Sequence, residues 1–84
     1  MKVGPSLAGS RLRITAARAW VLDAMATDPE RAWTLEDLAP IVRHHHGATA
    51  SETTAALRQL VKLRMIDVVV RGRTWRPGAW RVAS

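Results

Sequence analysis

The spacing of apolar side chains predicts three helices followed by two short strands. Between residues 15 and 26 the apolar positions recur every three or four residues, as on one face of an amphipathic helix. This helix should end before Pro29, because the residue preceding a proline avoids the helical region. Residues 1–13 are interrupted by glycine and proline, so they are predicted to form a flexible basic N-terminal arm.

A capping motif predicts the start of a second helix. Thr34 can accept a hydrogen bond from the backbone N–H of Asp37, and the Asp37 carboxylate can accept one in return from the Thr34 backbone. Gly47, after a basic turn, should end this helix. The ring of Pro40 opposes a carbonyl of the preceding turn, so the helix is expected to kink or split at Ala39.

A second capping motif, Thr49 with Glu52, predicts a third helix that reaches about residue 63. At 100° per residue, one side of this helix is mostly apolar and should face the core. That side consists of Ala50, Thr53, Thr54, Leu57, Leu60, Val61 and Arg64. The opposite, mostly polar side consists of Ser51, Glu52, Ala55, Arg58, Gln59 and Lys62.

After Met65 the apolar period changes from helical to two, which predicts a strand over residues 66–70. A turn-rich, arginine-rich segment follows at residues 71–78, and then a second short strand at residues 79–82. Together they predict a β-hairpin with a long basic tip. In the first strand, Ile66, Val68 and Val70 should face one way and Asp67, Val69 and Arg71 the other.

Charge is segregated along the chain, which has 84 residues and a net charge of +6. Residues 1–18 hold four bases and no acid, residues 19–60 three bases and six acids, and residues 61–84 six bases and one acid. Basic ends favour a polyanionic partner, because Lys and Arg near phosphates release counterions. Abundant arginine and alanine are also typical of a GC-rich genome, which leaves an incidental origin of the charge open.

The order helix, helix, helix, hairpin resembles that of bacterial winged helix-turn-helix transcription regulators. Residues 13–22 resemble the first-helix signature of ferric-uptake-type repressors, and residues 57–66 resemble a recognition helix that runs into a wing. The resemblance implies an α+β, mainly α fold over residues 14–84: a three-helix winged helix-turn-helix domain with a C-terminal β-hairpin wing.

The chain also departs from the ferric-uptake type. Arg64 stands where such families usually have glycine between the third helix and the wing, and Thr54 and Ala55 replace a Tyr-Arg pair. A metal-binding dimerisation domain rich in cysteine and histidine is missing. The resemblance therefore extends to the superfamily and not to that family.

By this resemblance the chain is a sequence-specific double-stranded DNA-binding protein and a transcriptional regulator. The third helix would enter the major groove, where Arg58 could bond guanine and Gln59 adenine, while Lys62 contacts the backbone. A hairpin rich in arginine would follow a phosphate ridge or the minor groove. The predicted DNA-binding residues are Arg11, Arg13, Thr49, Ser51, Arg58, Gln59, Lys62, Arg71, Arg73, Trp75 and Arg76.

For two residues, the sequence allows more than one role. Trp75 could stack on a base or fold back on the hairpin, and both interpretations are retained. Glu52 lies on the predicted reading side, where its carboxylate would repel phosphate unless it accepts a hydrogen bond from a cytosine amino group. A second interpretation, a winged-helix module that binds protein or RNA, therefore stays open, and a homodimer is a further hypothesis.

Metal, cofactor and enzymatic chemistry find no support in the sequence. The absence of cysteine removes disulfides, iron–sulfur clusters and thiolate zinc sites. Side chains at the adjacent positions 44–46, all histidine, diverge by about 100° each on a helix and cannot converge on one ion. We therefore expect no metal, no cofactor, no small-molecule substrate and no enzymatic activity.

No apolar run approaches the length that a membrane-spanning helix needs, and residues 1–13 lack the apolar stretch of a secretion signal. The sequence therefore predicts a cytoplasmic protein that does not enter a membrane.

Overall fold

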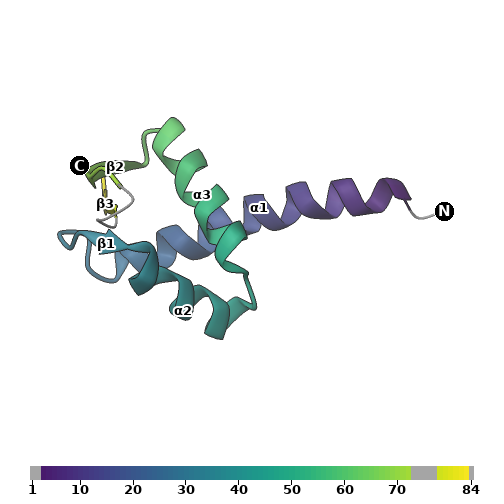
Figure 1. Cartoon of the computed structure of the whole chain (residues 1–84), viewed down its shortest axis with the longest axis horizontal. Helices are drawn as coiled ribbons and strands as arrows, with labels where there is room; N and C mark the ends of the chain where they lie inside the picture. Colours follow the sequence, from purple (N-terminus) through teal and green to yellow (C-terminus); the bar gives the residue numbers. More distant parts are fainter. Residues whose placement is uncertain (1–2, 73–77, 84) are drawn as a thin grey trace.

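A computed structural model describes the backbone of residues 3–72 and 78–83, and the side chains of residues 13–72 and 78–83. Figure 1 shows three helices and a small antiparallel sheet, arranged as a winged helix-turn-helix, which confirms the predicted fold class. The elements in chain order are α1 (Val3–Ala26), β1 (Trp33–Thr34), α2 (Leu35–His46), α3 (Ala50–Lys62), β2 (Ile66–Val70) and β3 (Ala79–Val82).

Helix α1 begins at Val3, so the prediction that residues 1–13 form an arm outside the helix was wrong from that point on. Pro5 lies in the first turn of α1, where the backbone N–H that proline lacks would have no helical partner. Gly9 costs only about 1 kcal/mol relative to alanine inside a helix. Figure 1 shows the N-terminal half of α1 projecting beyond the rest of the molecule.

The core lies where the three helices meet the sheet. Apolar side chains from all three helices and from the strands are almost fully buried in one cluster. The polar Thr53 is also buried, and its hydroxyl donates to the backbone carbonyl of Thr49 at 3.0 Å, which removes the cost of burying it. The main members of the cluster are Ala17, Val21, Met25, Trp33, Leu38, Val42, Ala56, Leu57, Leu60 and Ile66.

Both predicted capping motifs are present. The Thr34 hydroxyl accepts from the Asp37 backbone N–H at 3.1 Å, and the Asp37 carboxylate accepts from the Thr34 N–H at 3.0 Å. Helix α2 continues through Pro40 without splitting at Ala39. The carbonyl that Pro40 cannot bond belongs to Glu36 in the first turn, so a single backbone hydrogen bond is lost.

The strand β1 was not predicted. It has two residues, and it pairs antiparallel with β3 through Trp33 opposite Trp80. The sheet order is β1-β3-β2, so β3 is central. The Trp33 indole N–H donates to the Asp28 carbonyl at 3.2 Å, and the Arg31 guanidinium lies over the Trp33 ring at 4.2 Å. These contacts tie the segment after α1 to the core.

Three sequence expectations for α3 and the α3–β2 region were wrong. Ala50 is exposed rather than turned to the core, because it is the first residue of α3 and lies at the edge of the helix contacts. Arg64 is exposed rather than turned to the core, and its φ of 60° is left-handed. That conformation favours glycine, because glycine has no Cβ. In β2 the pairing with β3 shifts register between Val68 and Val70. This irregularity adds Val69 as an extra residue and interrupts the strict alternation of sides.

Candidate nucleic-acid interface

A short turn between α2 and α3 determines how the third helix is oriented relative to the second. Gly47 has a φ of 71°, and its N–H donates to the Arg43 carbonyl at 2.9 Å, which closes α2. Two residues later the Thr49 hydroxyl accepts from the Glu52 N–H at 3.1 Å, which opens α3. The two helices are therefore joined by three residues, as a helix-turn-helix requires.

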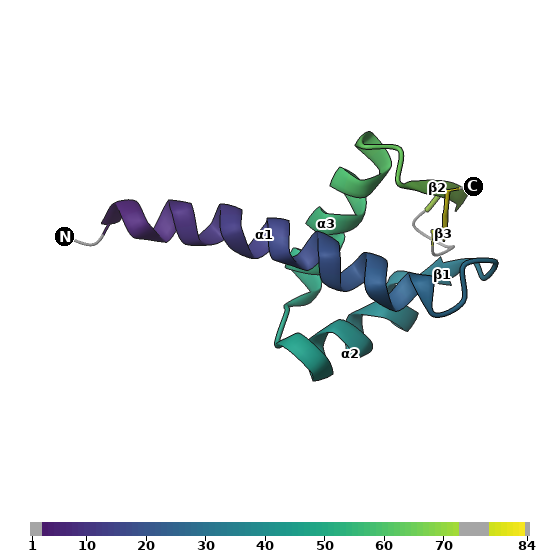
Figure 2. The ribbon, with the colours of Figure 1, turned by 180° about the vertical axis from the view of Figure 1, so that it is seen from behind.

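One side of α3 faces away from the core. Ser51, Arg58 and Lys62 are exposed and Gln59 is half-buried, as predicted for this side. Figure 1 shows α3 in front of α1, and Figure 2, from behind, shows α1 crossing in front of α3. Helix α1 thus covers the inner side of α3 and leaves the outer side uncovered.

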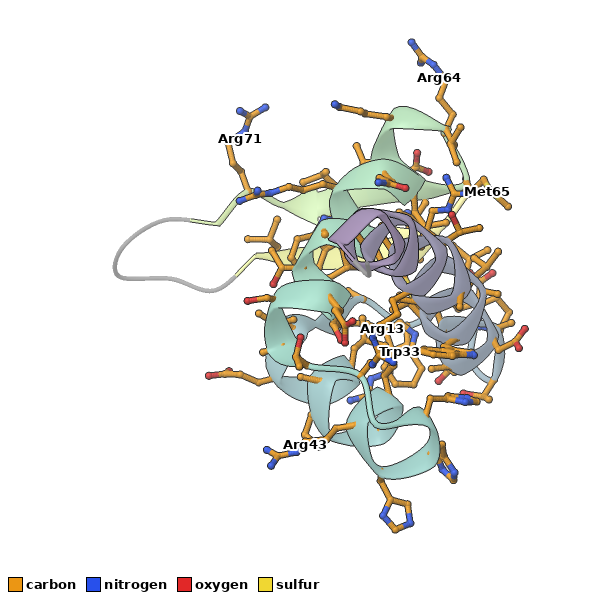
Figure 3. All side chains as sticks on the ribbon, turned by 90° about the vertical axis from the view of Figure 1, so that its right-hand side faces the viewer. Arg13, Trp33, Arg43, Arg64, Met65 and Arg71 are labelled. Atoms are coloured by element: carbon orange, nitrogen blue, oxygen red, sulfur yellow. The ribbon has the colours of Figure 1, made fainter. Side chains whose placement is uncertain are left out.

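Two arginines from other elements lie toward the same side of the molecule. In Figure 3, Arg71 at the end of β2 and Arg43 in the last turn of α2 both point to the side on which α3 lies relative to α1. Both residues are exposed. Arg43 was not among the predicted residues. Its position in the last turn of α2, just before the turn that leads into α3, is a signal in the sequence that could have identified it.

We define the basic face as Ser51, Arg58 and Lys62 of α3, with Arg43 and Arg71 on either side of them. Arg43 also lines an open hollow of about 600 Å³ between α2 and the start of α3, together with Ala39, Pro40, His44 and Ala50.

The structure gives Glu52 partners within the protein. The Arg13 guanidinium pairs with both carboxylate oxygens of Glu52: Nε donates to Oε2, and Nη2 donates to Oε1 at 3.0 Å. The Thr49 backbone N–H also donates to Glu52 Oε1, at 2.8 Å. These contacts pair the carboxylate at the start of α3 with a cation and with a backbone donor inside the protein.

The same contacts change the expected role of Arg13. It lies within α1 and not on a separate arm, and its Nη2 lies 3.5 Å from the Gly47 carbonyl as well as near Glu52. Arg13 therefore joins α1 to both ends of the helix-turn-helix turn. A direct phosphate contact by Arg13 would compete with this ion pair.

We expect acid to weaken the fold through Glu52. The hydrogen bond from Arg13 and the backbone N–H of Thr49 lower the pKa of Glu52 from 4.5 to about 2. Because the folded-state pKa is depressed, the stabilisation is complete above pH 4.5 and is lost as the pH falls toward 2. Urea unfolding of wild type and Glu52→Gln across this range measures the effect, and the variant should show a shallower decline. Identical pH profiles would contradict it.

Several predicted site residues cannot be placed. Arg73, Trp75 and Arg76 lie outside the described residues, and of Arg11 the structure describes only the backbone, which is helical. Thr49 is exposed and uses its hydroxyl as the cap acceptor of α3.

The histidines at the end of α2 are exposed, and the ring of His46 stacks on Trp20 at a centroid distance of 4.6 Å. Within the part of the chain that the structure describes, no three His, Cys, Asp or Glu side chains are grouped to hold a metal ion. In the same part of the chain, no helix combines the length and the apolar character needed to cross a membrane.

Comparisons of the chain with known protein families, with curated protein sequences and with solved structures found no match.

Proposed function

We propose that the chain is a sequence-specific double-stranded DNA-binding protein that regulates transcription, with α3 in the major groove. The observation that carries the proposal is the basic face itself. Its cations belong to α2, α3 and the end of β2, and all of them are exposed. A duplex presents phosphates on both sides of its major groove, so a helix flanked by cations matches its charge pattern.

The side chains of this face, and Gln59 next to it, are proposed to have different tasks. Arg58 and Gln59 lie in the middle of α3 and are proposed to read base edges, guanine and adenine respectively. Lys62 and Arg71 are proposed to contact phosphates, which position the protein without reading sequence. Ser51, in the first turn of α3, adds a hydroxyl beside the positive end of the helix dipole. No catalytic step is part of this proposal, and the place of action is the bacterial cytoplasm, where the chromosome lies.

The paired state of Glu52 supports DNA over the alternative of a protein or RNA partner. An uncompensated carboxylate at the start of α3 would repel a phosphate backbone. Here the carboxylate is held by Arg13 and by the Thr49 backbone, so the first turn of α3 carries no unpaired acid toward a ligand. A protein partner recognised through Glu52 would have to displace Arg13.

Binding to duplex DNA should fall steeply as salt rises. The logarithm of the association constant is expected to fall against the logarithm of salt concentration with a slope of about 0.9 for each phosphate contact. Lys62→Gln should reduce that slope by about 0.9, because one contact is removed. Arg18→Gln is the matched control: it removes one charge from α1, where Arg18 lines a hollow with Leu22 and Leu63 and is not part of the basic face, and it should leave the slope unchanged.

Fluorescence anisotropy with random and selected duplexes measures these slopes. Binding that is undetectable or independent of salt would overturn the DNA-binding proposal. Tight binding of single-stranded RNA, with duplex DNA unable to compete, would favour the alternative.

A further inference from the structure

Each of the two capping boxes is contacted by an arginine from outside its own helix. At the start of α2, Arg31 Nη2 lies 3.2 Å from Asp37 Oδ1. At the start of α3, the Arg13 guanidinium pairs with both carboxylate oxygens of Glu52. The two arginines are similarly exposed, with 46% of the side chain of Arg31 and 49% of that of Arg13 accessible to water. The two ion pairs differ in which parts of the fold they join.

The pair at α2 is local, whereas the pair at α3 joins two helices. Arg31 lies a few residues before Asp37 along the chain. Arg13 belongs to α1 and is 39 positions away from Glu52, and its Nη2 also lies 3.5 Å from the Gly47 carbonyl at the end of α2. A planar guanidinium that meets both oxygens of a carboxylate fixes orientation as well as distance. The Arg13–Glu52 pair is therefore suited to hold the first turn of α3 at one angle to α1.

The core holds the middle and the end of α3 more firmly than its first turn. The buried side chains of α3 begin at Thr53, and the large apolar ones are Leu57 and Leu60. Over residues 43–52, by contrast, the one buried side chain is the small methyl group of Ala48 in the turn. The Glu52 side chain is 18% exposed and is held by polar contacts. The angle of the first turn of α3 therefore depends strongly on the ion pair.

This angle matters for base reading. A recognition helix enters the major groove with its N-terminal half toward the base edges. Hydrogen bonds weaken steeply once donor and acceptor are misaligned, so a small tilt of the helix is enough to lose a bond to a base edge. Side chains that read sequence have to be held by rigid neighbours for this reason.

We propose that Arg13 is a positioning residue for DNA reading: through Glu52 it holds α3 at the angle at which Arg58 and Gln59 reach the base edges. The inference rests on the proposed function and adds to it a residue that acts without touching the duplex. An exposed ion pair contributes little to stability compared with a buried apolar side chain. Loss of Arg13 should therefore affect binding more than folding.

Anisotropy titrations of a selected duplex against wild type, Arg13→Gln, Glu52→Gln and the double variant test the route of this effect. Arg13→Gln should lower the association constant of wild type about tenfold, but that of Glu52→Gln by less than about twofold, because the carboxylate that Arg13 holds is already gone. An equal loss in both backgrounds would mean that Arg13 contacts the duplex directly, and it overturns the proposal.

Arg13→Lys separates geometry from charge. Lysine keeps the positive charge beside Glu52 but lacks the planar fork that meets both oxygens. Binding should stay at least about threefold weaker than in wild type, since one-point pairing leaves the angle of α3 free. Full recovery of wild-type affinity in Arg13→Lys would show that charge alone is sufficient, and it overturns the positioning role.

Arg31→Gln is the matched control. It removes the same charge from a similarly exposed arginine that also pairs with a capping-box acid, but at α2. Its affinity for the duplex should stay within about twofold of wild type. Urea denaturation of every variant establishes that it is folded under the conditions of the titration, because a folded variant loses affinity only when its binding-competent state is less populated.

A second measurement needs no DNA. The chain has no cysteine, so spin labels can be attached to Asp23→Cys in α1 and Ser51→Cys in α3, and their distance distribution measured by double electron–electron resonance. Arg13→Gln should shift or broaden this distribution, and Arg31→Gln should not. Duplex binding by wild type with an unchanged distribution in Arg13→Gln overturns the positioning role alone. A shifted distribution with no duplex binding by wild type overturns the proposed function, while the hold of Arg13 on α3 stands.

Discussion

Replacing Arg58 by alanine is expected to lower the affinity for the preferred duplex by about 1–3 kcal/mol and to level the differences between sequences. Arg58 is exposed in the middle of α3, and its guanidinium can form two hydrogen bonds with a guanine edge in the major groove. Losing these bonds weakens binding to sequences with guanine at the contacted position and leaves other sequences almost unchanged. Selection from random duplexes, followed by anisotropy titration, measures both effects.

Lys62→Ala is the comparison for Arg58→Ala. Lys62 lies one turn further along the same exposed side of α3 and is proposed to contact phosphate. Its removal should weaken all duplexes alike and preserve their order of preference. If Arg58→Ala instead lowers affinity uniformly, Arg58 is a phosphate contact, and base reading has to be assigned elsewhere on α3.

Replacing the neighbouring Leu57 by alanine is expected to destabilise the fold by about 2–5 kcal/mol. Leu57 is 1% exposed and packs in the centre of the three-helix core, so its truncation leaves a cavity that rigid neighbours fill only in part. A domain of this size has only about 4–12 kcal/mol of total stability, so the loss is a large share of it.

Urea denaturation of Leu57→Ala and Arg58→Ala measures this contrast between adjacent residues. Arg58→Ala should stay within about 0.5 kcal/mol of wild type, because the side chain is exposed and no hydrogen bond or ion pair within the described structure depends on it. A small effect of Leu57→Ala would show that the inner side of α3 is accessible to water in solution and does not form part of the core.

Features that depend on neighbours in sequence were predictable. The two capping boxes involve residues three apart, so Thr34 with Asp37 and Thr49 with Glu52 could be identified from the sequence alone. The burial of Leu57 and Leu60 and the exposure of Arg58 follow from helical period. These local rules were enough to give the three helices, the hairpin and the outward side of α3.

Features that depend on distant partners were not predictable. The strand β1 forms because Trp33 pairs with Trp80 in the sheet. A pattern of two residues is too short to predict a strand from the sequence. The pairing of Arg13 with Glu52 joins residues 39 positions apart, so no spacing rule could find it. Gly4, Pro5 and Gly9 were weighed as helix breakers, whereas α1 contains all three.

Helix α1 carries two different contacts along one continuous backbone. Arg13 contacts the start of α3, and Ala19 and Leu22 line a hollow that Leu60, Leu63 and Met65 line from the end of α3 and the turn after it. An α-helix resists bending and stretching far more than the loops around it, so it behaves as a rod that moves as one piece. Any change in the tilt of this rod is carried directly to the angle at which α3 is held, because Arg13 joins α1 to Glu52 in the first turn of α3.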